Sequence, residues 1–104
     1  MSLTGSLSAA VSGLYASAAK TNAAATNIAN ANTKDYKAVS IQTSSITTTG
    51  GVASGVLVHA QEHGSPDIAT ELVNLIQAET AYQANVTVVR GVDDLYKQLI
   101  DVRG

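Results

Sequence analysis

Hydrophobic residues recur at alternating steps of four and three over residues 65–103, which is the spacing of a coiled-coil seam. The seam positions are Ile68, Leu72, Leu75, Glu79, Tyr82, Val86, Val89, Asp93, Tyr96 and Ile100. The pattern predicts one long helix, which Ser65 would cap, with Pro66 and Asp67 in its first turn. A helix of this length extends about 55–60 Å and needs a partner to cover its apolar side.

A second apolar row follows the first in the later half of this segment. It consists of Val88, Val92, Leu95, Leu99 and Val102. One row is enough for a two-helix seam, so the second row predicts a further contact surface. The opposite row is polar and should face water or a polar groove; it consists of Gln83, Thr87, Arg90, Asp94, Lys97 and Asp101.

Residues 3–31 form the second helical segment, with a seam of smaller side chains. Its positions are Leu3, Leu7, Ala10, Leu14, Ser17, Thr21, Ala24 and Ile28. Lys20 is the one charged side chain between residues 1 and 33. A helix without a charged face is either surrounded in an assembly, disordered until it meets a partner, or packed on its neighbour as an ordinary alanine-rich helix. The asparagines at positions 30 and 32 favour an end to the helix there.

Between the helices, residues 36–61 change to the period of a β-strand. Residues 36–48 alternate and are rich in Thr, Val and Ile, Gly50-Gly51 indicates a turn, and residues 52–60 read as a second strand. The alternative is that residues 44–54 form a mobile loop. The sequence therefore predicts a single domain, 1–104, of the mainly α class: two long helices, 3–31 and 65–103, with a short β-hairpin or loop between them.

Composition narrows the possible functions. The net charge is −2 with a pI near 5.4, and the six Lys and Arg residues are scattered, so no basic nucleic-acid-binding face is expected. The chain has no Cys, Phe or Trp, and its many alanines favour close approach of helices. No apolar run approaches eighteen residues and no secretory signal is visible at the start, so neither a membrane span nor a cleaved signal peptide is expected.

Candidate catalytic and metal-binding patterns are weak. His59, Glu62 and His63 have a spacing that binds metal only on a helix, and here they lie in a strand-like stretch next to a breaker. The glycosylation sequon at Asn85 lies inside the long helix, and no serine or glycine pattern matches a nucleophile elbow or phosphate loop. We therefore expect no enzyme activity, no cofactor and no small-molecule substrate.

Two segments resemble the rod and hook proteins of the bacterial flagellum. The first runs from Ala25 to Thr33, Ala-Thr-Asn-Ile-Ala-Asn-Ala-Asn-Thr, and closes with Tyr36-Lys37; the family pattern there is Thr-Pro-Gly-Tyr, and Lys34-Asp35 stands in place of Pro-Gly. The second runs from Asp67 to Asn85 and contains Glu-Leu-Val-Asn-Leu-Ile and Ala-Tyr-Gln-Ala-Asn. The residues that carry the resemblance are Asn27, Ile28, Asn30, Asn32, Thr33, Tyr36, Glu71, Leu72, Asn74, Tyr82 and Asn85.

The resemblance implies a structural subunit of the flagellar axial structure. Such proteins pair their terminal helices as an antiparallel coiled coil, and they assemble with copies of themselves and with neighbouring axial proteins. It also implies export in the unfolded state through the flagellar type III apparatus, without signal cleavage, to an extracytoplasmic place in the basal body. The short middle, residues 38–64, fits either a minimal rod-type subunit or a protein from which a middle domain has been removed.

We expect assembly and coiled-coil contacts at a set of apolar residues on both helices. They are Leu3, Leu7, Leu14, Ile28, Leu72, Leu75, Ile76, Tyr82, Val86, Val89, Val92, Leu95 and Leu99. The leucines and isoleucine of the first helix should pack on the row that contains Leu72, Leu75, Tyr82, Val86 and Val89, while Val88, Val92, Leu95 and Leu99 should face neighbouring subunits. The alternative function is a stand-alone helical-hairpin adaptor, which would form a complex of fixed size.

Overall fold

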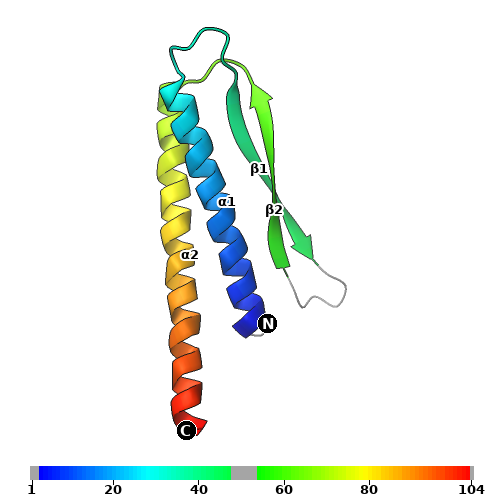
Figure 1. Ribbon diagram of the computed structural model, residues 1–104, viewed down its shortest axis with the longest axis vertical. Helices are drawn as coiled ribbons and strands as arrows, with labels where there is room; N and C mark the ends of the chain where they lie inside the picture. Colours follow the sequence, from blue (N-terminus) through cyan, green and yellow to red (C-terminus); the bar gives the residue numbers. More distant parts are fainter. Residues whose placement is uncertain (1–2, 48–53, 104) are drawn as a thin grey trace.

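The computed structural model describes residues 3–47 and 54–103, which form two long helices joined through a β-hairpin (Figure 1). The elements in order are α1 (Leu3–Ala29), β1 (Ala38–Thr47), β2 (Ser54–His63) and α2 (Ile68–Arg103). The predicted mainly α class, with an antiparallel helix pair and a hairpin between the helices, is confirmed. The molecule measures 61 × 29 × 15 Å, and its radius of gyration of 17.4 Å exceeds the roughly 13 Å of a compact chain of this length.

Helix α1 is the middle layer of the molecule, with α2 on one side and the hairpin on the other (Figure 1). Among the described elements, α1 packs against all three others, whereas α2 packs against α1 alone. Two faces of α1 are therefore covered within the chain. This arrangement gives a physical reason for the near absence of charge on α1, because charged side chains are costly to bury.

Small side chains make up the interior of this fold. The buried apolar residues are Ala10, Ala16, Ala24, Ala38, Ala78 and Val92. The large apolar side chains lie mainly outside, and most of the exposed ones belong to α2. This distribution is the reverse of a typical monomer, in which leucine and isoleucine fill the core.

The side of α2 that α1 covers coincides only in part with the predicted row. Glu71, Ala78 and Val92 are buried on α2, whereas Leu72 and Tyr82 are 46% and 43% exposed. Tyr82 lines a hollow beside Ala18 and Thr21 of α1. Val92, predicted to face a neighbouring subunit, is buried inside the chain. The physical reason is that α1 offers small side chains, so the backbones approach closely and the contact follows the smaller residues of α2.

One close approach fixes the register of the helix pair. A Cβ atom placed on Gly13 of α1 would lie 2.7 Å from Nδ2 of Asn85 in α2. That amide already donates to the carbonyl oxygen of Ala81 at 3.0 Å. Gly13 is therefore needed for packing, which offsets its cost of about 1 kcal/mol against alanine inside a helix.

Substitutions at two glycines should have opposite effects. Gly13→Ala should lower the free energy of unfolding by about 1 kcal/mol, because Asn85 must move and give up its bond to Ala81. Gly91→Ala should raise it by about 0.5–1 kcal/mol, because a Cβ there would meet no described atom within 4 Å apart from its chain neighbours and the nearby helix backbone. Denaturation followed by circular dichroism measures both. In an Asn85→Ala background the loss at Gly13 should disappear; an unchanged loss would contradict the register.

Helix α2 begins at Ile68, with Asp67 as its N-cap residue in place of the predicted Ser65. The carbonyl oxygen of Asp67 accepts the first helical bond from the Glu71 amide at 2.9 Å, and the Thr70 hydroxyl donates to the Asp67 carboxylate at 2.7 Å. Pro66 precedes the cap. Asp67 suits the cap position because its side chain is a preferred N-cap and its negative charge interacts favourably with the positive end of the helix dipole.

The hairpin is antiparallel, with pairs from Ala38↔His63 to Thr47↔Ser54. Its first strand includes Ser44, so the described part of residues 44–54 is strand rather than loop, and the predicted Gly50-Gly51 turn lies outside the described residues. His59 lies on β2, and the described residues contain no cluster of three or more potential metal ligands. No helix in the described ranges is both long and apolar enough to cross a membrane.

Candidate functional site

Asn27 joins the end of α1 to the start of β1. Its side chain is 1% exposed. The Asn27 Nδ2 donates to the Val39 carbonyl oxygen at 2.8 Å, and the Val39 amide donates to the Asn27 Oδ1 at 2.9 Å. The Tyr36 hydroxyl donates to the same Oδ1 at 3.1 Å. The amide thus pairs with Val39 as a neighbouring strand would, and it ties the hairpin to α1.

The chain leaves α1 through a turn that Asn30 and Thr33 stabilise. The Asn30 side chain donates to the Thr26 carbonyl oxygen at 2.9 Å, and the Thr33 hydroxyl donates to the Asn30 Oδ1 at 3.0 Å. The Thr33 amide donates to the Asn30 carbonyl oxygen at 3.0 Å. These bonds satisfy groups at the C-terminal end of the helix that have no partner within it. Four resemblance residues of the first segment, Asn27, Asn30, Thr33 and Tyr36, therefore take part in the hydrogen bonds of this junction.

Asp35 has a backbone φ of 60° and is the one non-glycine residue with positive φ in the described ranges. It occupies the position where the related rod and hook pattern has glycine. Glycine adopts this left-handed conformation without steric cost, whereas aspartate tolerates it at some cost. The departure of Lys34-Asp35 from Pro-Gly leaves the turn intact for this reason.

Asp35→Gly should therefore stabilise the protein, by about 0.5–1 kcal/mol. Lys34→Gly is the matched control, since Lys34 does not have a positive φ, and it should give no gain. Thermal unfolding of the two variants beside the parent chain makes the comparison. Equal effects at both positions would contradict the conformational explanation.

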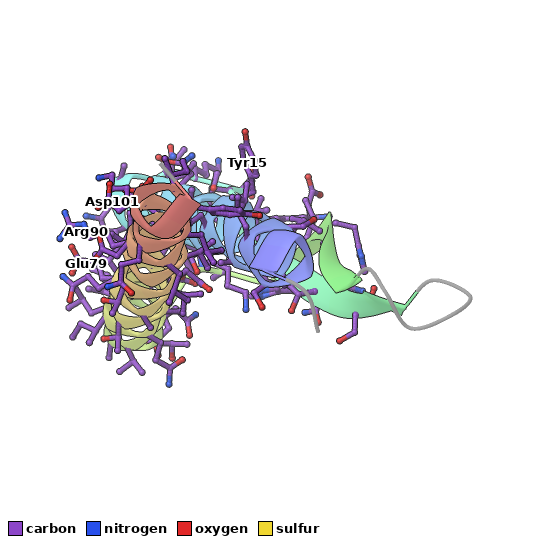
Figure 2. The ribbon with its side chains drawn as sticks, turned by 90° about the horizontal axis from the view of Figure 1, so that it is seen from below. Tyr15, Glu79, Arg90 and Asp101 are labelled. Carbon is purple, nitrogen blue, oxygen red and sulfur yellow. The ribbon has the colours of Figure 1, made fainter. Side chains whose placement is uncertain are left out.

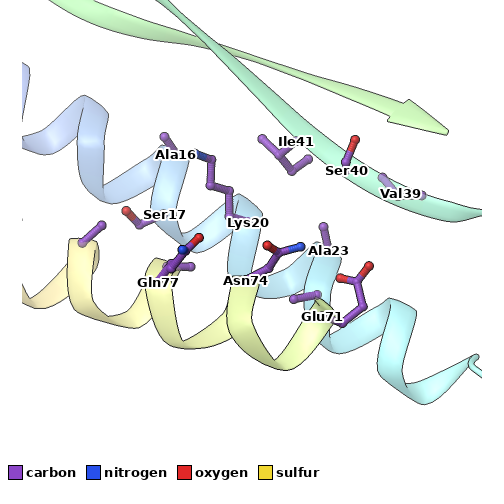
Figure 3. A pocket seen from close by; sticks show the side chains of 13 residues that line it. Ala16, Ser17, Lys20, Ala23, Val39, Ser40, Ile41, Glu71, Asn74 and Gln77 are labelled. Atoms are coloured by element: carbon purple, nitrogen blue, oxygen red, sulfur yellow. The ribbon is translucent and has the colours of Figure 1, made fainter. Parts of the chain in front are cut away.

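A groove runs between β1 and α2 across the face of α1 (Figure 3). Lys20 from α1, Glu71 and Asn74 from α2, and Val39 and Ile41 from β1 line it. Glu71 is buried beside the helix interface and its carboxylate points into the groove (Figure 3). The polar lining keeps these groups in reach of water, and every buried side-chain nitrogen or oxygen of the described residues has a hydrogen-bond partner. We find no nucleophile and base arranged for catalysis among these groups.

Most of the exposed apolar side chains of α2 lie in two places, and Tyr82 and Val88 are exposed between them. The outer patch, near its start, consists of Ile68, Leu72, Val73 and Ile76, and the overhang, near its end, consists of Leu95, Leu99 and Ile100. Between and beyond them, Arg90 and Asp101 lie on the side of α2 that faces away from α1 (Figure 2), whereas Glu79 lines a hollow beside Thr21 and Asn22 of α1. The two patches are thus separate surfaces rather than one stripe.

The remaining predicted contact residues lie closer to the helix interface. Six of them are half-buried: Leu7, Leu14, Ile28, Leu75, Val86 and Val89. Leu3 begins α1, and its side chain lies outside the described residues. Of the resemblance residues, Asn30, Tyr36 and Asn85 are half-buried, whereas Asn32, Thr33 and Asn74 are exposed.

Ion pairs contribute little to the stability of the helix pair. Lys97 and Asp93 form an ion pair of 2.9 Å one helical turn apart, and both side chains are largely exposed. The hydrogen bond from Lys97 to Asp93 and the opposite charge of Asp93 raise the pKa of Lys97. Water screens such a pair, so it does not decide the fold.

Two family models match the chain, and they cover the two helices and the junction. The Flagella basal body rod protein model matches residues 7–37, and the Flagellar basal body rod FlgEFG protein C-terminal model matches residues 67–102. The chain belongs to the flagellar basal body rod family. No curated protein matches it. The rod-family segments thus comprise α1 with its Asn27 junction and α2 from its cap residue onward, and both leave out the hairpin.

As a rod-family protein, the chain is a structural component of the flagellar basal body, and this family is in general not enzymatic. Sequence reasoning placed Asn27 and Tyr36 at the helix exit, but it did not find that the Asn27 side-chain amide binds both the Val39 backbone and the Tyr36 hydroxyl. The sequence shows only an asparagine, Asn27, before a segment of alternating residues. This pattern does not predict that Asn27 binds Val39, twelve residues away. The close approach at Gly13 carried no signal beyond the glycine itself.

Proposed function

We propose that the protein is a rod-type subunit that assembles with other copies and with neighbouring axial proteins through its helices. In this proposal α1 and α2 form a preassembled pair, and the exposed apolar residues of α2 bind adjacent subunits. The alternative of a helical-hairpin adaptor shares the fold but predicts a single bound partner.

The observation that carries the proposal is that small side chains are buried while large apolar side chains are exposed. The interior consists largely of alanines, while Leu72, Ile76, Leu99 and Ile100 are between 46% and 67% exposed. Exposed clusters of this kind favour association, because burying a leucine or isoleucine side chain contributes about 1.5–3 kcal/mol. An elongated chain with so small a core gains much of its stability from neighbours.

The proposal includes export through the flagellar type III apparatus and a final place outside the cytoplasm. A thin, small-residue core supports this, because such a chain costs less to unfold for passage than one with a large aromatic core. Fusing a stably folded domain to the chain should block its secretion from a flagellated cell, while a disordered tag of similar length should not. Secretion of both fusions would contradict the export step.

Sedimentation velocity over a concentration series tests assembly against the adaptor alternative. A subunit that assembles should shift to larger species as concentration rises, and hydrogen exchange in residues 3–29 should slow in parallel. Complexes whose size is fixed and independent of concentration would contradict assembly and favour the adaptor.

A further inference from the structure

The contact between α1 and α2 ends before α2 does. Helix α2 has 36 residues and α1 has 27. Because Gly13 lies against Asn85, Leu3 at the start of α1 lies opposite Leu95 in this antiparallel pair. The last eight residues of α2, about 12 Å at 1.5 Å per residue, thus extend past the first residue of α1, and Figure 1 shows the C-terminal end reaching beyond the N-terminal end.

The apolar row of the helix interface continues into this extension. Ala78 and Val92 are buried by α1, and Leu99, at the next step of seven, is 51% exposed. Leu95 and Ile100 are also exposed beside it. The side of α2 that faces α1 therefore continues past the first residue of α1, where Leu99 and Ile100 are exposed.

The outer patch at the other end of α2 has a matching length. Its residues span positions 68–76, nine residues or about 13 Å along the helix. Beyond Ile76 the same outward side carries Arg90 and Asp101 (Figure 2). Pairing the outer sides of two α2 helices along their full length would bury those charges, so apolar contact on this side is confined to the first turns.

We propose that the overhang of one copy binds the outer patch of α2 in the next copy. This inference rests on the proposed assembly function and names the contact that extends the assembly along its axis. The contact joins two different patches at opposite ends, so it is head-to-tail and does not close into a dimer. It also places the negative C-terminal end of one α2 beside the positive N-terminal end of the next, which is the favourable alignment of helix dipoles.

The chain lacks cysteine, which makes cross-linking a direct test. Purified full-length protein carrying both Val73→Cys and Ile100→Cys is treated with a short bismaleimide at a concentration where assembly occurs. The head-to-tail contact predicts a ladder of covalent multimers from the double variant, and a dimer when the two single variants are mixed. Each single variant alone should give little product.

Three outcomes would overturn the inference. Efficient dimerisation of the Ile100→Cys variant alone would indicate a two-fold contact instead. Concentration-dependent assembly without cross-linking between positions 73 and 100 would leave the proposed function standing and remove this contact. Absence of any larger species would overturn both.

A charge substitution gives a second, independent readout. Leu99→Glu should raise the concentration needed for half-assembly at least about tenfold, because it places a charge in a contact that excludes water. The circular dichroism of the unassembled chain should not change, because Leu99 extends past α1. Gln98→Glu is the matched control on the neighbouring exposed residue and should assemble normally. Equal effects of both substitutions would contradict a specific overhang contact.

Discussion

Asn27→Ala should lower the free energy of unfolding by about 2–4 kcal/mol, the largest expected loss from removing a single polar side chain in this protein. The substitution removes both hydrogen bonds to Val39 and the acceptor of the Tyr36 hydroxyl. It leaves the Val39 amide and carbonyl without partners next to a helix end. Chemical denaturation measures the loss, and hydrogen exchange at the Val39 amide should accelerate because that amide is no longer bonded to the helix.

Asn22→Ala is the matched control for this prediction. Asn22 lies on the same helix and is exposed, so its removal should change the free energy of unfolding by less than about 0.5 kcal/mol. If the two alanine substitutions were equally mild, Asn27 would not be the link between α1 and the hairpin. The family-motif asparagine would then need another explanation.

Two adjacent residues of α2 separate folding from assembly. Leu75 is half-buried in the helix interface, and Ile76 is 61% exposed. Leu75→Asp should unfold or strongly destabilise the chain, and abolish assembly and motility, because it brings an unpaired charge into the interface. Ile76→Asp should leave the helix content and the unfolding midpoint of the chain nearly unchanged and still prevent assembly, because it charges the outer patch.

The comparison uses circular dichroism for the fold and sedimentation for assembly, with swimming in soft agar as the cellular readout. Gln77→Asp, on the next exposed residue, controls for added charge alone. Wild-type motility of the Leu75→Asp variant would contradict the seam, and normal assembly of Ile76→Asp would contradict a role for the outer patch.

The period of the hydrophobic pattern predicted the two long helices, because three- and four-residue steps leave few alternatives over so many residues, and the family resemblance implied their antiparallel pairing. The same pattern did not separate the positions of α2 that are buried by α1, such as Ala78 and Val92, from an exposed one such as Leu72. Leu72 fits the coiled-coil spacing as well as Leu75 does, so hydrophobicity alone does not distinguish them. Side-chain size was the missing criterion: the row that contains Ala78 and Asn85 lies against Gly13 because small groups allow the closest approach.

The junction was predictable in place but not in detail. Asparagines at the end of α1 indicated a turn, since they favour helix ends and left-handed conformations. The bidentate pairing of Asn27 with Val39 depends on where β1 returns, which is a tertiary relation that local sequence does not encode. Asp35 has a positive φ. The glycine that the related pattern has at this position was the one indication that the backbone would be left-handed there.

Concentration-dependent sedimentation of the parent chain beside Ile76→Asp is the measurement that tests assembly through α2 most directly. The account predicts that the parent forms progressively larger species as concentration rises, while Ile76→Asp remains a folded monomer with the same helix content. Growth of both proteins to the same size at the same concentration would contradict the claim that the exposed apolar surface of α2 builds the assembly.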